Sequence, residues 1–290
     1  MYGGTQRIHG RCAQYLFMKK PKTSKKEKAK MIKIDDHRGL RPFVIQAKKQ
    51  KRSYVLDHNE IYKFDEKTIS FRQPNNISIS LNISSREYDI SKEMYPSKIT
   101  PKLKKLKTDK HIEFEKSECK DLFDFFEHLQ VSLIFAYTAV EAFSNVAIPD
   151  KFTFDKLNNK KVKETWTKEN IERWLSTTEK LGDIVPTILE VPSPKGQPFW
   201  DNFKKLEKIR DEIIHQKTIT NETNVSSRFL KDFFKPSIFE IVRSGYLVIQ
   251  YFCSQSKVNQ IYFPLGMGTA KIEPLVVDDF EKHFATVEDK

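Results

Sequence analysis

The stretch ECKDLFDFFEHLQVSLIFAYTAVEAFSNVAI, residues 118–148, decides the fold class of this chain. Its apolar residues recur three and four positions apart, which places them on one face of an α-helix. That face carries Leu122, Phe125, Phe126, Leu129, Leu133, Ala136, Tyr137, Val140 and Ala147. About eight turns pass without a glycine or proline before Pro149 ends the segment. A long helix with one buried face is therefore predicted here.

Three more helices are predicted downstream, over residues 167–181, 198–217 and 226–254. The first begins at Thr167, a residue suited to helix N-caps, and Gly182 is expected to stop it. The second begins with Pro198, which favours the first helical position. The third is broken at Pro236, and the stretch SIFEIVRSGYLVIQYF after the break is nearly all apolar. We expect these helices to form one bundle over residues 117–255.

The N-terminal half has a different pattern, typical of β-structure. The segments RPFVIQA, RSYVLD, EIYKFD and TISFRQ, within residues 41–73, are short and rich in β-branched and aromatic residues. In NISISLNIS, residues 76–84, apolar and polar residues alternate, which predicts a half-buried strand. Residues 91–117 contain Pro96 and Pro101 and are interpreted as a linker.

The predicted fold class is α+β, with a small antiparallel β-sheet and a basic arm followed by a helical bundle. The predicted parts are a basic flexible arm (1–30), a small β-rich domain plus linker (31–116), the helical bundle (117–255) and a C-terminal tail (256–290).

Positive charge is concentrated at the N-terminus. The chain has a net charge of +12. Residues 1–50 hold 14 Lys and Arg against 3 Asp and Glu, whereas residues 118–290 hold 23 against 26. We expect a solvated, disordered arm over residues 1–30. Two sharper interpretations remain open, a tail that binds nucleic-acid phosphates and a contact for an acidic partner.

Several functional classes are excluded by their motifs. The cysteines, Cys12, Cys119 and Cys253, are odd in number and far apart, so they predict neither a disulfide framework nor a metal site. The sequence contains no HExxH, GxSxG or P-loop motif. No metal and no cofactor is expected. Apolar runs reach only about ten residues, so no membrane contact is expected and a cytoplasmic location is favoured.

One arginine stands out on the helix PFWDNFKKLEKIRDEIIHQK, residues 198–217. At 100° per residue, Arg210 lies about 20° from Phe199 and inside the apolar stripe formed with Phe203 and Leu206. A guanidinium keeps its proton when it is buried, so it needs an acidic or hydrogen-bonding partner. Arg210 therefore either forms a structural bridge or faces a cleft.

Arg210, Asp211 and His215 form a recognisable motif in the phrase LEKIRDEIIHQ. It resembles the HEPN family, whose ribonucleases carry an arginine, four to six intervening residues and a histidine late in a helical bundle. The resemblance covers residues 118–255 and implies a metal-independent endoribonuclease that acts on RNA, as toxins or abortive-infection effectors do. It also implies a homodimer in which two motifs form one composite active site, and an antitoxin or a sensor protein as a further partner.

The chemistry assigns a role to each residue. Cleavage without a metal needs proton transfer and stabilisation of the phosphorane charge, so His215 is the expected acid and base and Arg210 the phosphate clamp. Asp211 is expected to orient His215, and Glu141 on the long helix to pair with Arg210. Two alternatives remain open. In the first, the chain is a catalytically silent HEPN module for dimerisation or RNA binding. In the second, it is a helical interaction protein in which Arg210 is only a structural bridge.

Overall fold

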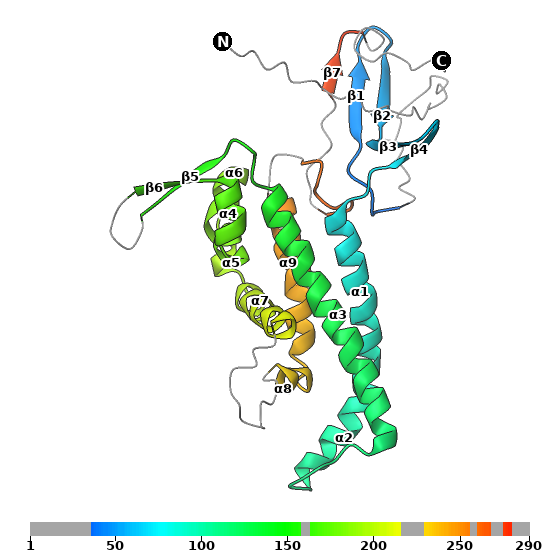
Figure 1. Cartoon of the computed structure of the whole chain (residues 1–290), viewed down its shortest axis with the longest axis vertical. Helices are drawn as coiled ribbons and strands as arrows, with labels where there is room; N and C mark the ends of the chain where they lie inside the picture. Colours follow the sequence, from blue (N-terminus) through cyan, green and yellow to red (C-terminus); the bar gives the residue numbers. More distant parts are fainter. Residues whose placement is uncertain (1–35, 158–162, 216–228, 256–259, 268–274, 280–290) are drawn as a thin grey trace, which may run out of the picture. The chain divides into compact units, whose positions relative to one another are not determined.

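The computed structural model describes residues 36–157, 163–215, 229–255, 260–267 and 275–279 (Figure 1). The predicted basic arm lies outside these ranges. The described residues form two compact units. Unit 1 contains the residues up to Asn75, together with 260–266 and 275–279, and unit 2 contains those from Asn76 to Gln255, together with Met267. The α+β class is confirmed, since unit 1 consists of short strands and unit 2 is mainly helical.

Unit 1 is built from β1 (Phe43–Ala47), β2 (Arg52–Leu56), β3 (Asn59–Phe64), β4 (Lys67–Arg72) and β7 (Leu275–Val277). β1 pairs antiparallel with β2 and parallel with β7, whereas β3 and β4 form a separate antiparallel hairpin. Ile45 and Ala47 point inward from β1 and pack with Leu56 and Val277. The strands predicted over residues 41–73 are confirmed. The prediction of a purely antiparallel sheet is wrong, because part of the expected tail supplies the parallel strand β7.

The strand predicted over residues 76–84 is wrong, because this segment begins the helix α1 (Asn76–Met94). The buried residues of α1 recur at helical spacing and most of them are serines: Ile77, Ser78, Ser80, Ser84, Glu87 and Ser91. Small side chains let α1 approach the long helix α3 closely, and the Ser84 hydroxyl donates to the Ser132 carbonyl of α3 at 2.9 Å. The alternating pattern predicts that these serines lie on the solvent face of a strand, whereas in the structure they lie on the contact face of a helix.

The predicted linker over residues 91–117 is also largely helical. α1 continues into a π-helical turn (Tyr95–Ile99), α2 (Thr100–Lys104) and a 3₁₀ turn (Lys105–Lys107). Pro96 lies in the π-helical turn and Pro101 near the start of α2, and neither proline ends the helical path. Unit 2 therefore begins at Asn76, well before the predicted boundary.

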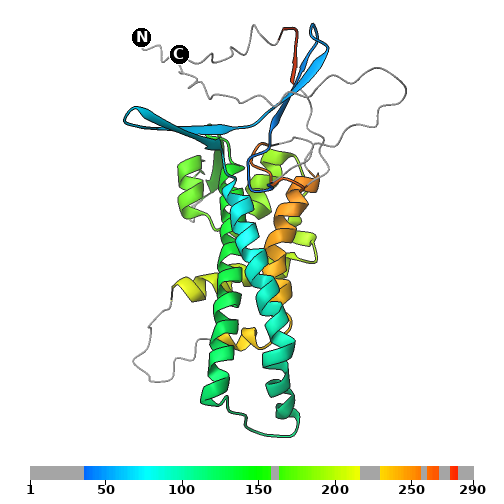
Figure 2. The ribbon, with the colours of Figure 1, turned by 90° about the vertical axis from the view of Figure 1, so that its right-hand side faces the viewer.

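The centre of unit 2 is α3 (Lys116–Val146), as the sequence predicts. It packs against α1, α7 (Trp200–Ile214) and α9 (Ile238–Gln255), while α8 (Leu230–Phe233) precedes the break at Pro236 (Figures 1 and 2). A Cβ atom on Gly245 of α9 would come within 3.2 Å of Ala136 on α3, so glycine keeps these helices close. By length and composition α3 could cross a membrane, and half of its most apolar window is buried inside unit 2.

The predicted helix over residues 167–181 is divided in two. After the hairpin of β5 (Thr153–Leu157) and β6 (Lys163–Thr167), α4 (Lys168–Trp174) ends early. Ser176 then caps α5 (Thr177–Glu179), which leads into a π-helical turn (Lys180–Ile184), α6 (Val185–Leu189) and a 3₁₀ turn (Pro194–Gly196). Gly182 does not stop the helix. It lies within the π-helical turn, where a Cβ atom would meet the Lys195 side chain at 2.5 Å.

Candidate functional site

Helix α7 positions Arg210 at the edge of the core. Its buried residues are Trp200, Phe203, Leu206 and Ile209. Arg210 follows on the same face, one turn before the helix ends, and its side chain is 22% exposed. The predicted position of Arg210 within an apolar stripe is thus confirmed. The core no longer covers the final turn, so Ile214 is 48% exposed.

Three side chains surround the Arg210 guanidinium. It lies 4.8 Å from the centre of the Tyr137 ring of α3, a cation–π contact. Its Nη2 atom lies 3.6 Å from Glu141 Oε2, so the predicted pairing of Glu141 with Arg210 is confirmed. This distance is too long for a hydrogen bond. Nη1 donates to Asp211 Oδ1 at 3.1 Å, and the buried Nε–H has no acceptor among the described residues.

Tyr137 is held by a polar network beneath the arginine. Its phenol oxygen lies 2.9 Å from Thr177 Oγ1 and 3.0 Å from Glu207 Oε1. The other Glu207 oxygen accepts from the Thr178 hydroxyl. Burial raises the pKa of the Tyr137 phenol, and the carboxylates of Glu207 and Glu141 raise it further. The phenol therefore stays protonated and donates to Glu207, which fixes the ring under Arg210.

A second cation, Lys180, is buried next to this network and is only 2% exposed. Its ammonium donates to Asn145 Oδ1 at 2.8 Å and to the Glu172 carbonyl at 3.1 Å. Burial lowers the pKa of Lys180, whereas the carboxylates of Glu141, Glu172 and Glu207 act in the opposite direction. The ammonium of Lys180 therefore interacts electrostatically with Glu141, which also pairs with Arg210. We call Tyr137, Glu141, Lys180, Glu207 and Arg210 the arginine cluster.

His215 is the C-terminal cap residue of α7, and its backbone N–H donates to the Asp211 carbonyl at 2.8 Å. Its side chain is exposed, and the structure gives the imidazole no hydrogen-bonding partner within the described ranges. Asp211 does not orient this imidazole as expected, because its carboxylate binds Arg210 instead. The structure therefore brings Glu141, Arg210 and Asp211 together and leaves His215 at the exposed helix end.

The sequence interpretation missed Tyr137, Lys180 and Glu207 as parts of this site. Two of them carried a signal, since Tyr137 precedes Glu141 by four positions and Glu207 precedes Arg210 by three, on the same helix faces. Lys180 carried none. It reaches the cluster because the chain turns back through α5 and the π-helical turn, a path that local periodicity does not encode.

The arrangement suits anion binding more than metal binding. In the part of the chain that the structure describes, no three His, Cys, Asp or Glu side chains gather closely enough to hold a metal ion. Arg210 has five N–H donors, and only one hydrogen bond from them is found among the described residues. A guanidinium fixed on an aromatic ring with donors to spare can bind a phosphate group through two parallel hydrogen bonds.

Comparisons with known proteins add no relative. No protein-family model matches this chain, and no curated protein or solved structure is similar to it.

Proposed function

We propose that this protein is a metal-independent endoribonuclease of the HEPN type that acts as a homodimer in the cytoplasm. The observation that supports this best is the state of Arg210. Tyr137 and Glu141 fix its guanidinium, yet most of its N–H donors have no acceptor among the described residues. The exposed imidazole of His215 ends the same helix. A cation for the phosphate and a group for proton transfer are the minimum for cleaving RNA without a metal.

Each residue then has one task. His215 takes the proton from the attacking 2′-hydroxyl and returns one to the leaving 5′-oxygen, since an imidazole exchanges protons near neutral pH. Arg210 binds the phosphate oxygens and stabilises the charge of the phosphorane. Asp211 and Glu141 orient Arg210 from two sides. The products of this scheme carry a 2′,3′-cyclic phosphate.

A homodimer follows from the spacing of the motif. Positions five apart on a regular helix differ by about 140°, and His215 lies just past the regular end of α7, so we do not expect Arg210 and His215 of one chain to share a face. Two chains that pair near the end of α7 would bring the Arg210 of one subunit to the His215 of the other. A composite site of this kind requires dimerisation for activity.

The structural bridge remains a second candidate, and a specific observation favours it. Arg210 is mostly covered, and its contacts with Tyr137 and Glu141 join α7 to α3 without any ligand. Because Glu141 is 39% exposed, this ion pair contributes about 1 kcal/mol or less, and the cation–π contact with Tyr137 adds a similar amount. In this case the chain is a silent module or a helical interaction protein.

The decisive experiment compares RNA cleavage by the purified chain with that of His215→Ala and Arg210→Ala, all in EDTA. Total RNA is the substrate, and the exposed His111 supplies a matched control, His111→Ala. We expect His215→Ala to lower cleavage by about 10²- to 10⁴-fold. The control should cleave like the unaltered chain. Mass spectrometry of the products should detect the cyclic phosphate.

Other outcomes separate the alternatives. If neither the unaltered chain nor any variant cleaves RNA, and the chain is dimeric, the silent module is correct. Unfolding of Arg210→Ala, together with no cleavage by any chain, supports the structural bridge. A requirement for Mg²⁺ contradicts the proposed mechanism.

The biological role that we propose with this activity is that of a toxin or an anti-phage abortive-infection effector, because RNA cleavage stops translation. An antitoxin or a sensor protein would then control it. Induced expression of the unaltered chain should arrest growth, whereas His215→Ala should not. If both chains are equally toxic, the growth arrest does not depend on catalysis by His215.

A further inference from the structure

The segment that joins α1 to α3 carries an unusual excess of lysine. Between residues 98 and 110 the sequence has six lysines and one aspartate, a net charge of +5 over 13 residues. Residues 118–290, which include the later helices of unit 2, hold more acidic than basic residues. All six lysines except Lys102 are exposed. The segment is therefore a local source of positive potential on an otherwise near-neutral unit.

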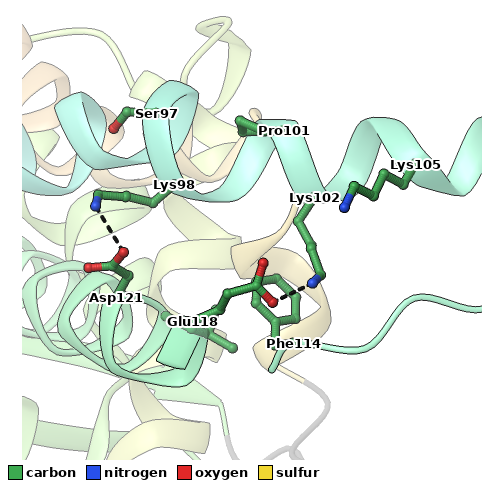
Figure 3. A pocket seen from close by; sticks show the side chains of 9 residues that line it. Ser97, Lys98, Pro101, Lys102, Lys105, Phe114, Glu118 and Asp121 are labelled. Carbon is green, nitrogen blue, oxygen red and sulfur yellow. Dashed lines mark hydrogen bonds and ion pairs between the residues drawn. The ribbon is translucent and has the colours of Figure 1, made fainter. Parts of the chain in front are cut away.

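Two of these lysines anchor the segment to the start of α3. Lys98 lies 2.9 Å from Asp121, and Lys102 forms an ion pair with Glu118 (Figure 3). The Lys102 ammonium also lies 5.5 Å from the centre of the Phe114 ring. These side chains line a pocket of about 240 Å³. Their charges are used inside the fold, so they contribute little to binding an external partner.

The other four, Lys104, Lys105, Lys107 and Lys110, form no ion pair with the described residues; Lys105 also lines the pocket, where its charge helps to lower the pKa of Glu118. They are exposed, and no carboxylate of the described residues lies within ion-pair distance of them. Lys104 and Lys107 are three positions apart, a spacing at which like charges on a helical turn repel each other. We call these four residues the lysine tip. They weaken the local structure slightly and produce a charge that no internal partner neutralises.

The lysine tip lies toward the same end of unit 2 as helix α8. The Tyr95 hydroxyl donates to the Phe234 carbonyl, just after α8, at 2.6 Å. The rings of Phe114 and Phe234 are 6.2 Å apart. α8 therefore packs beside the base of the lysine tip, and Figures 1 and 2 show it between α7 and the tip of the α1–α3 hairpin.

The length of helix α3 gives an estimate of the distance between Arg210 and the base of the lysine tip. Tyr137 lies under Arg210, and Glu118 pairs with Lys102. These two positions are 19 residues apart, which corresponds to about 28 Å along the helix axis. A strand with a rise of about 3.4 Å per nucleotide needs roughly eight nucleotides to cover that distance.

We propose that the lysine tip binds the phosphate backbone of the RNA strand whose scissile phosphate lies at Arg210. This inference rests on the proposed ribonuclease function. Four flexible ammonium groups without an aromatic platform bind phosphates regardless of base sequence. The tip therefore adds affinity only for RNA that extends about eight nucleotides or more from the cleavage point. It selects for strand length and leaves base preference unchanged.

The test measures binding of fluorescent single-stranded RNA to the catalytically blocked His215→Ala chain. In this background Lys104, Lys105, Lys107 and Lys110 are all changed to Gln. The control carries the same loss of charge elsewhere, at the exposed Lys51, Lys63, Lys67 and Lys151. Fluorescence anisotropy gives Kd over a range of salt concentrations. Two RNAs are used, one of about 20 nucleotides and one of about five, within the usual range of single-strand sites.

For the long RNA, we expect the tip variant to bind at least about tenfold more weakly than the control variant at low salt. The slope of log Kd against log salt should also be smaller by about three. The short RNA should lose much less affinity in the tip variant, because it cannot contact Arg210 and the lysine tip at the same time. Equal slopes for the tip variant and the control overturn the proposal, as does equal weakening for both RNA lengths. Loss of long-RNA binding without cleavage by the unaltered chain would contradict the ribonuclease function and retain the tip as an RNA site.

Discussion

The arginine cluster and the lysine tip use the same kinds of cation in opposite ways. Lys180 is 2% exposed and makes two hydrogen bonds, whereas Lys104 is exposed and has no partner among the described residues. A buried charge costs several kcal/mol unless it is paired, so its partners fix its position. An exposed charge costs little and contributes to a field that extends about 10 Å. The first arrangement suits one oriented contact, and the second suits a polymer of phosphates.

The largest effect that tests this contrast comes from truncating one lysine in each region. Lys180→Ala removes a buried four-carbon stem and leaves Asn145 without its donor, so we expect unfolding to become easier by about 3 kcal/mol. Lys104→Ala should change stability by less than about 0.5 kcal/mol. Urea unfolding of both variants measures the difference.

Lys180→Met separates packing from charge. It keeps the length of the side chain and removes the buried ammonium, so it should cost about 1 kcal/mol or less. Equal losses for Lys180→Ala and Lys104→Ala would show that Lys180 is not a buried, paired group.

A cation also lies over an aromatic ring both in the arginine cluster and beside the lysine tip: Arg210 over Tyr137 at 4.8 Å, and Lys102 over Phe114 at 5.5 Å. Tyr137→Phe keeps the ring and removes the phenol that donates to Glu207. We expect a loss of about 1.5 kcal/mol in the free energy of unfolding. The loss should be smaller in a Glu207→Ala background, which removes the carboxylate acceptor and leaves Thr177 as the partner of the phenol, and a double-mutant cycle measures this coupling.

A further, pH-dependent effect is expected on α3 between the two regions. His128 Nδ1 and Glu87 Oε2 are 2.7 Å apart, and this bond, with Arg86, lowers the pKa of the Glu87 carboxyl. Its stabilising contribution is present above the ordinary carboxyl pKa and is lost as pH falls through the lowered value. Glu87→Gln should cost about 1 kcal/mol at pH 6.5 and progressively less toward pH 3. A cost that does not change with pH would show that the charge of Glu87 has no part in it.

The sequence predicted α3 and failed on α1, and the physical reason is the type of residue at the contact. α3 buries large apolar residues such as Phe125 and Leu129 at helical spacing, which is a strong signal. α1 buries Ser80, Ser84 and Ser91, whose polarity hides the same spacing. Close packing of small residues is a property of the pair of helices and is not visible in one of them.

The candidate site shows the same contrast between features that could and could not be predicted from the sequence. The pairing of Glu141 with Arg210 was predictable because both angular positions follow from regular helices. The partner of Asp211 was predicted wrongly, because the regular helix ends at Ile214 and His215 adopts a non-helical backbone. Lys180 could not be predicted, since its place depends on how the chain returns between α4 and α7. The ribonuclease activity itself remains a prediction.

The parallel pairing of β1 with β7 has a consequence for biosynthesis. Ile45 and Leu275 are neighbours in the sheet although 229 positions separate them. Until residues 275–277 have been synthesised, the helices of unit 2 are already available to fold, but one edge of β1 still presents free amide and carbonyl groups. Exposed strand edges are sites of mispairing with other chains. The nascent protein therefore passes through a stage in which this edge is open, and shielding it until translation reaches Val277 is a task suited to a chaperone.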